Sequence, residues 1–281
     1  PSDNIVLGVT FGVFFLLTCG LIVYQFFTGM SDVPGAAVGI LGFLFFVLMV
    51  IVFLGILLGI GMLLVRITRH TVLGNSMEVQ YSSYAWLRDW ANTVAADLQL
   101  PEVEIFVTQD PMINAYAIGF ARPYIIVLHS GSIRYLTKDE LKVVVVHEMA
   151  HIKYHHTNAL VYLQPFLSIP VISVLGSWIA GFWQRRTEYT ADRLALMYLE
   201  DADLVKNSLV KVHVGPDTAS DMNDVARQWQ QYKTSQPMNR FSQTFSTHPF
   251  LVRRLEQVDY WDSVLKNPQP QVYQQQVSQP M

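Results

Sequence analysis

The chain has 281 residues, 51% hydrophobic and 15% charged, a composition that is apolar for a soluble protein and indicates membrane segments. Its formal net charge at pH 7 is −3 and the sequence has no basic stripe, which excludes a nucleic-acid-binding protein. The single cysteine, Cys19, excludes an intrachain disulfide framework and a cysteine-ligated zinc site.

Two long apolar stretches begin the chain. Residues 5–27 and 36–65 carry no charge, and about 20 apolar residues are enough to span a bilayer core as a helix. Both are predicted transmembrane helices, and the second is long enough that it must tilt or project out. The loop between them has no basic residue, whereas Arg66, Arg69 and Arg88 follow the second stretch. The positive-inside rule therefore predicts a cytoplasmic N-terminus and a cytoplasmic domain from about residue 70.

A small sheet is expected next. Residues 76–100 have apolar side chains at helical spacing and are predicted to form one amphipathic helix that ends before Pro101. Residues 103–107 and 124–128 are rich in β-branched and aromatic side chains, so they are predicted strands. The segment 114–118 lies between them, ahead of a turn.

His147, Glu148 and His151 form the pattern H-E-x-x-H in an apolar run that Thr137 and Glu140 open as a capping box. Histidines four residues apart lie on one helical face, so both imidazoles can bind one zinc ion. The glutamate can then reach a water on that ion. A lone histidine in such a helix is usually a core residue. Burying three ionisable groups without a metal or partners costs several kcal/mol per unpaired charge, which favours the zinc site.

Zinc hydrolases usually have three protein ligands and one open position. The metzincin pattern is excluded, because Tyr154 and Thr157 occupy the positions where it requires a glycine and a histidine. His155 and His156 lie a further turn along the same predicted helix. A straight helix cannot bend them back onto the metal, so we expect structural roles for them or polar contacts at the helix end.

A carboxylate from a second helix is the alternative third ligand. Glu188 and Asp192 are four apart on a helix predicted over residues 185–199, so they share a face. Glu188 is predicted to bind the metal. Asp192 is predicted to accept a hydrogen bond from the free N–H of a ligating histidine, with His147 as the expected partner. A solvated helix face would be the better interpretation of Glu188 if it stood alone.

Residues 157–184 form an uncharged stretch that contains Pro165 and Pro170. Because His151 precedes it and Glu188 follows it, a single bilayer crossing would separate two ligands of one ion by about 30 Å. Its 28 residues are too few for two crossings. We predict a bent helical hairpin that packs on the domain or dips shallowly into the membrane.

The remaining sequence predicts three helices and a tail. Two helices are expected near residues 202–213 and 217–233, and a third runs from about residue 250 to 265 after a polar loop. Residues 267–281 are rich in Gln and Pro and are predicted to be disordered.

The H-E-x-x-H pattern followed by Glu188-x-x-Ala-Asp192 resembles the HtpX-type zinc metallopeptidases, a family that includes the CAAX prenyl endopeptidases. Two further motifs are similar to those of the family over roughly residues 70–265. The first is Asn114, Ala115, Tyr116 and Ala117, and the second is Thr247, His248 and Pro249 with Arg254.

The resemblance implies hydrolysis of internal peptide bonds with one Zn²⁺ per chain. Glu148 would accept a proton from water and pass it to the leaving amine. His248 would hydrogen-bond the developing oxyanion. Arg254 would anchor His248 or help neutralise the site, with a surface arginine as the alternative. The segment 114–117 would be the edge strand on which an extended substrate lies.

We therefore predict a mainly α protein with a small β-sheet (α+β), in which two N-terminal transmembrane helices precede a zincin-type domain. Residues 1–70 would be the membrane anchor, residues 71–266 the peptidase domain and residues 267–281 the tail. The predicted function is quality control of misfolded or membrane proteins in a bacterial inner membrane. A CAAX-type or other processing protease and a non-catalytic membrane scaffold or chaperone are the alternatives. The expected partners are protein or peptide substrates and the bilayer, and glycine pairs in the transmembrane helices could also let chains associate.

Overall fold

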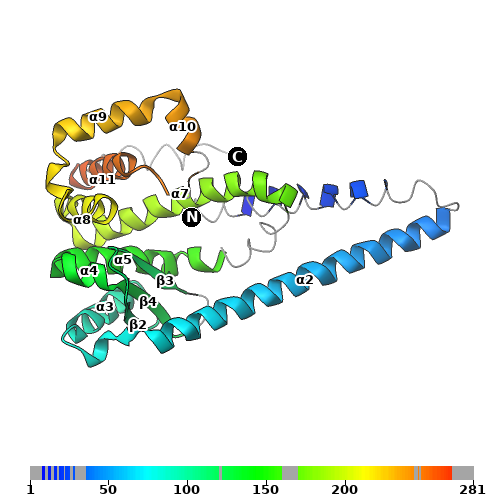
Figure 1. Ribbon diagram of the computed structural model, residues 1–281, viewed down its shortest axis with the longest axis horizontal. Coiled ribbons are helices and arrows are strands. Elements are labelled where there is room, and N and C mark those ends of the chain that lie inside the picture. Colours follow the sequence, from blue (N-terminus) through cyan, green and yellow to red (C-terminus); the bar gives the residue numbers. More distant parts are fainter. Residues whose placement is uncertain are drawn as a thin grey trace.

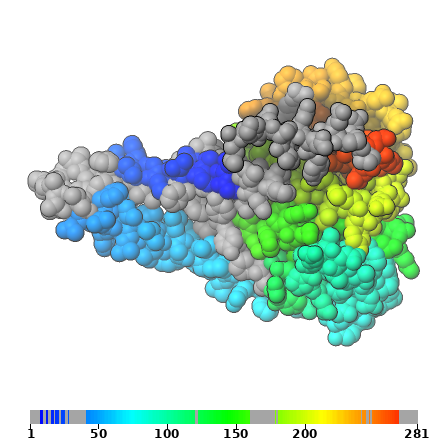
Figure 2. Space-filling view, turned by 180° about the vertical axis from the view of Figure 1, so that it is seen from behind, coloured from blue at the N-terminus to red at the C-terminus, as the bar shows by residue number. Residues whose placement is uncertain are grey.

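The computed structural model describes residues 36–119, 122–159, 170–243, 246 and 248–267, with single positions between residues 8 and 28. The positions described between 8 and 28 are helical, but the first predicted span as a whole lies outside the described residues. Helix α2 (Ala36–Asn75) projects from one end of a rounded body formed by the later elements (Figures 1 and 2). In the described part of the chain, α2 alone is long and apolar enough to cross a membrane.

Helix α2 continues beyond its predicted end at residue 65 and is fixed to the body by its last turns. Large apolar side chains along its first part are exposed, from Leu41 at 69% to Ile67 at 52%. Arg69 is buried, and its guanidinium donates a 2.8 Å hydrogen bond to the carbonyl of Pro123. Val72 then packs against one face of the sheet. One helix therefore combines a membrane-length apolar surface with a firm attachment to the domain.

The sheet has four strands in the order β1 (Met77–Glu78), β2 (Val103–Thr108), β4 (Tyr124–His129) and β3 (Ala115–Ile118). β2 and β4 are parallel, while β1 and β3 pair antiparallel with their neighbours. Ile126 and Leu128 of β4 face the main core, and Ile125 and Val127 face the end of α2. Both faces of this strand are covered, which explains its unbroken apolar sequence. β3 is an edge strand of the described sheet.

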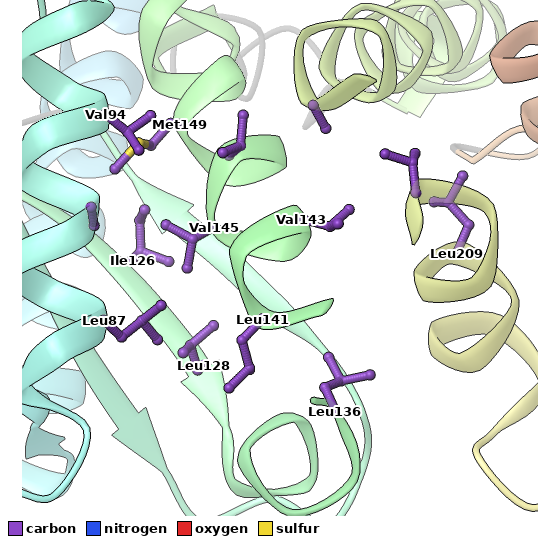
Figure 3. Packing of buried hydrophobic residues seen from close by; sticks show 14 of the residues in the cluster. Leu87, Val94, Ile126, Leu128, Leu136, Leu141, Val143, Val145, Met149 and Leu209 are labelled. Carbon is purple, nitrogen blue, oxygen red and sulfur yellow. The ribbon is translucent and has the colours of Figure 1, made fainter. Parts of the chain in front are cut away.

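Helices α3 (Ala85–Asp97) and α5 (Lys138–Lys153) follow the predicted order with one correction, and the short helix α4 (Ser130–Tyr135) before α5 was not predicted. The single helix predicted over residues 76–100 is wrong at its start, because β1 and the 3₁₀ helix η1 (Val79–Tyr81) occupy that segment. Pairing of Met77 with Val107 of β2 replaces helical hydrogen bonds there. Figure 3 shows Leu87 of α3 and Val145 of α5 meeting Ile126 of β4 in the main core.

Helix α5 begins as predicted and ends earlier. The Thr137 side chain accepts a hydrogen bond from the Glu140 N–H, and the Glu140 carboxylate accepts one from the Thr137 N–H, which confirms the capping box. The helix stops at Lys153, and His155 has a left-handed φ of 59°. The prediction of one continuous helix through His156 is therefore wrong.

The remaining helices lie on the side of α5 opposite the sheet (Figure 1). They are α7 (Pro170–Leu199), α8 (Ala202–Val214), η2 (Ala219–Asp221), α9 (Asp224–Ser235), α10 (Pro237–Gln243) and α11 (Leu251–Lys266). α7 begins at Pro170 instead of Arg185, because a proline is tolerated in the first turn of a helix. The hairpin predicted over residues 157–184 and the tail beyond residue 267 lie partly or wholly outside the described residues.

Candidate metal centre and catalytic site

Two histidines of α5 face one another across one helical turn. The Nε2 atoms of His147 and His151 are 3.2 Å apart. The Nδ1 atom of His147 lies 3.0 Å from Asp192 Oδ1, and the Nδ1 atom of His151 lies 3.1 Å from His156 Nδ1. Each ring is therefore held at Nδ1, which leaves both Nε2 atoms directed at the same point.

Helix α7 adds a carboxylate to this pair. Glu188 Oε2 is 3.6 Å from His147 Nε2, and Glu188 Oε1 is 3.6 Å from His151 Nε2. The donor atoms of these three residues all lie within 4.8 Å of one another. The structure thus brings together the three ligands predicted from the sequence.

The donor set fits a divalent cation. If Nδ1 of each ring carries its proton, the two bare Nε2 atoms repel one another at 3.2 Å unless a proton or a cation lies between them. A tetrahedral zinc ion with bonds of about 2.0–2.1 Å would place two nitrogen ligands about 3.3 Å apart. Two imidazoles and one carboxylate with an open side are also the ligand types of catalytic zinc sites.

The pKa values of the two histidines also indicate that a cation binds between their rings. Burial opposes a charged imidazolium, but hydrogen bonds with Asp192 and Glu188 outweigh it and raise the pKa of His147 to about 10. Burial, reinforced by the nearby His147, lowers the pKa of His151 to about 4. Without a metal the pair therefore carries one proton more than two neutral imidazoles, and a cation would replace that extra proton.

Arg254 of α11 lies beneath the two carboxylates and is 4% exposed. Its Nε and Nη2 donate to the two oxygens of Asp192 at 2.7 and 2.6 Å, and its Nη1 lies 3.0 Å from Glu188 Oε2. Burial opposes the charged carboxylates, but Arg254 holds the pKa of Glu188 well below its usual range and lowers that of Asp192. The contacts of Arg254 in the described residues thus favour neutralisation of the site over anchoring of His248.

Glu148 points into the cleft beside the histidines and is 8% exposed. Burial raises the pKa of its carboxyl group to about 7, although His147 favours the charged form. A hydrogen bond from the backbone of Ala117 on β3 also favours the carboxylate. A carboxyl group with a pKa near neutrality can both take up and release a proton.

His248 lies at the rim of the site. Its side chain is 66% exposed, and its Nδ1 is 3.6 Å from Glu188 Oε1. Interaction with Glu188 raises the pKa of His248 despite partial burial. Thr247, part of the same motif, lies outside the described residues.

A cleft of about 640 Å³ connects these groups. Asn114, Ala115, Tyr116 and Ala117 line one wall, where β3 presents its free edge. The start of this wall is fixed, because Ser132 of α4 bonds to both the N–H and the carbonyl of Asn114. All the residues predicted for substrate binding therefore border the same cleft as the histidines.

Two further histidines belong to the site and were not predicted from the sequence. His156 contacts His151, as described above. His213 of α8 has its Nδ1 2.8 Å from the Leu209 carbonyl and its Nε2 3.4 Å from Arg254 Nη1. No glycine or proline marks the turn before His156, and a histidine in the last turn of α8 has no distinguishing spacing, so no sequence pattern identifies either residue.

Comparisons with known proteins agree with this geometry. The model of peptidase family M48 matches residues 82–181 and 167–262. The chain is 29% identical over 214 residues to plastoglobule-localized metallopeptidase 48 of Arabidopsis thaliana, which covers 69% of this chain and 62% of that protein. It is 24% identical over 202 residues to an HtpX protease homologue of Bacteroides fragilis, which covers 56% and 62%.

A solved structure shares the fold. The crystal structure of S. mikatae Ste24p superposes with a TM-score of 0.53 at 20% sequence identity, over 90% of this chain and 67% of that chain. The present chain spans 62% of the length of the Arabidopsis and Bacteroides relatives. The matches therefore cover the helices and strands that build the metal centre, and not the full length of these relatives.

Proposed function

The chain belongs to peptidase family M48, a family of metallopeptidases, and we propose that it is a membrane-anchored zinc endopeptidase that hydrolyses internal peptide bonds. The observation that carries this proposal is the placement of Glu148 beside three converging donor atoms, in a cleft bordered by an edge strand. A purely structural role would not explain why several ionisable residues gather in one cleft.

His147, His151 and Glu188 would hold one zinc ion. When bound there, zinc supplies a Lewis acid that polarises the scissile carbonyl and lowers the pKa of a water molecule. Asp192 would keep the proton of His147 on Nδ1, so that Nε2 stays bare. Arg254 would compensate the negative charge of both carboxylates, which would otherwise be buried without a partner.

Glu148 would act as the proton acceptor. Its carboxylate takes the proton from the attacking water and then transfers it to the nitrogen of the leaving amine. Burial raises the pKa of Glu148, which favours release of the proton in the second step, and a bound cation would favour the carboxylate that the first step needs. His248, exposed at the rim, would donate a hydrogen bond to the oxyanion that forms at the scissile carbonyl.

The substrate would lie extended along β3. An edge strand offers unpaired backbone groups, to which a peptide can add as a further strand. This would place the backbone of the peptide against residues 114–117, next to Glu148, which accepts a hydrogen bond from the backbone of Ala117. Main-chain recognition of this kind would tolerate many side chains, which is compatible with misfolded proteins as substrates.

Membrane proteins are the substrates that the architecture favours. Helix α2 and the N-terminal half of α7 project from the same end of the domain (Figure 1). Trp178 and Phe182 are each 49% exposed on that part of α7, and the adjoining Trp183 and Gln184 line the cleft. We infer a quality-control role at a bacterial inner membrane, with the domain on the cytoplasmic side as the basic residues after the second predicted span indicate.

Cleavage of an unfolded casein-type substrate by the purified full chain tests this function. We expect cleavage that a chelator abolishes and that added zinc restores. Glu148→Gln should fold and bind zinc but lose proteolysis by orders of magnitude. Binding of the substrate without cleavage by the metal-loaded wild-type chain would instead favour the scaffold alternative.

A further inference from the structure

His156 reaches the metal centre because a turn at residues 154 and 155 ends α5. Tyr154 is the C-cap of this helix, and His155 takes a left-handed φ of 59°. The next residue, His156, then lies beside the preceding turn, with its Nδ1 3.1 Å from His151 Nδ1. The two ring centroids are 5.2 Å apart at an interplanar angle of 68°.

The contact determines where protons lie. Two Nδ1 atoms at 3.1 Å share one hydrogen bond, so one ring donates and the other accepts. His151 directs its Nε2 at His147 Nε2 and at Glu188, so that nitrogen must be bare to bind a metal. The proton of His151 is therefore on Nδ1, and His156 is the acceptor.

The acceptor itself is held in place. His156 is 4% exposed. Its ring stacks on Tyr154 at 5.8 Å and meets the edge of Trp183 at 5.9 Å. Because Trp183 belongs to α7, the same helix that supplies Glu188, the ring is positioned by both helices that carry ligands.

We propose that His156 is a positioning residue that holds His151 in the tautomer and orientation needed to bind the metal. It does for His151 what Asp192 does for His147, at almost the same distance from Nδ1. The inference rests on the proposed metal site and adds a residue that would hold a metal ligand in place without binding the metal itself.

Two variants with the same side-chain branching test the proposal. His156→Asn keeps an oxygen acceptor near the position of Nδ1, whereas His156→Leu has the same number of side-chain heavy atoms and no acceptor. Both variants lose the imidazole ring and its contacts, so the main difference between them is the capacity to accept the hydrogen bond. Partners of metal-bound histidines change metal affinity by about 10–100-fold, so we expect His156→Leu to bind more weakly than His156→Asn by about that factor.

The measurement is the dissociation constant of zinc, obtained by competition with a chromophoric chelator on the purified full chain. The d–d absorption bands of the cobalt-loaded chain give a second readout, and they should shift in His156→Leu and stay close to wild type in His156→Asn. His155→Asn is the control, because His155 is an exposed neighbour and Asn tolerates its left-handed backbone. The control should match wild type in both readouts.

Equal zinc affinity and equal cobalt spectra for His156→Leu and His156→Asn would overturn the positioning role while the metal site stands. A wild-type chain that binds no zinc would overturn the proposed function, and this inference with it.

Discussion

Replacement of Arg254 by methionine should destabilise the domain strongly. The guanidinium is 4% exposed and makes two hydrogen bonds to Asp192, at 2.6 and 2.7 Å, and an ion pair with Glu188 at 3.0 Å. Removing one partner of a buried ion pair costs about 3–5 kcal/mol, because it leaves the other charge buried and uncompensated. For a domain of this size each kcal/mol lowers the melting temperature by about 2–4 °C, so Arg254→Met should melt about 6–20 °C below wild type.

Thermal melting of the metal-free chain in detergent measures this change. Arg253→Met is the matched control, because Arg253 is adjacent and its ion pair within the described residues is with the partly exposed Glu256, at 2.8 Å. Such a surface pair contributes about 0–1 kcal/mol. Equal melting temperatures for the two variants would refute the conclusion that the Arg254 network is buried and coupled.

Three further predictions concern the reaction and the membrane. The value of kcat/KM should fall as the pH drops through a midpoint at or below about 7, because Glu148 must be ionised to accept a proton and a bound cation favours its carboxylate; undiminished activity at pH 4 would contradict this. His248→Phe should lower kcat more than it raises KM in steady-state kinetics, whereas a change in KM alone would make His248 a substrate-binding residue. Cysteines placed at Asn158 and Gln184, in a Cys19→Ser background, should react with an impermeant thiol reagent from the same side of oriented vesicles; labelling from opposite sides would contradict a shared metal site.

Local patterns in the sequence predicted the elements that depend on local chemistry. The capping box at Thr137 and the apolar run after it define the start and the type of α5, because both interactions lie within one turn. The i, i+4 spacing on α5 and α7 placed His147 and His151 on one face and Glu188 on another helix. Because the expected third ligand lies on the second helix, the sequence also predicts that these two helices meet.

Tertiary contacts decided the features that the sequence did not predict. The segment at Met77 has helical spacing, but its backbone pairs with Val107 of β2 instead of forming the first turn of a helix. The run from Pro170 continues smoothly into the helix of Glu188 because the proline falls in the first turn. The turn at His155 uses a left-handed residue that is not glycine, and no composition signal marks it. As a result, the sequence-based prediction left His156 outside the site.

Metal content of the purified full chain is the most direct test of the account. We predict about one zinc per chain, measured by atomic emission against protein concentration, and its loss in His147→Ala, His151→Ala and Glu188→Ala. Glu102→Ala, an exposed glutamate distant in sequence from the site, should retain the ion. Full zinc occupancy in the Glu188→Ala variant would contradict the proposed ligand set and, with it, the assignment of α7 as the third source of metal coordination.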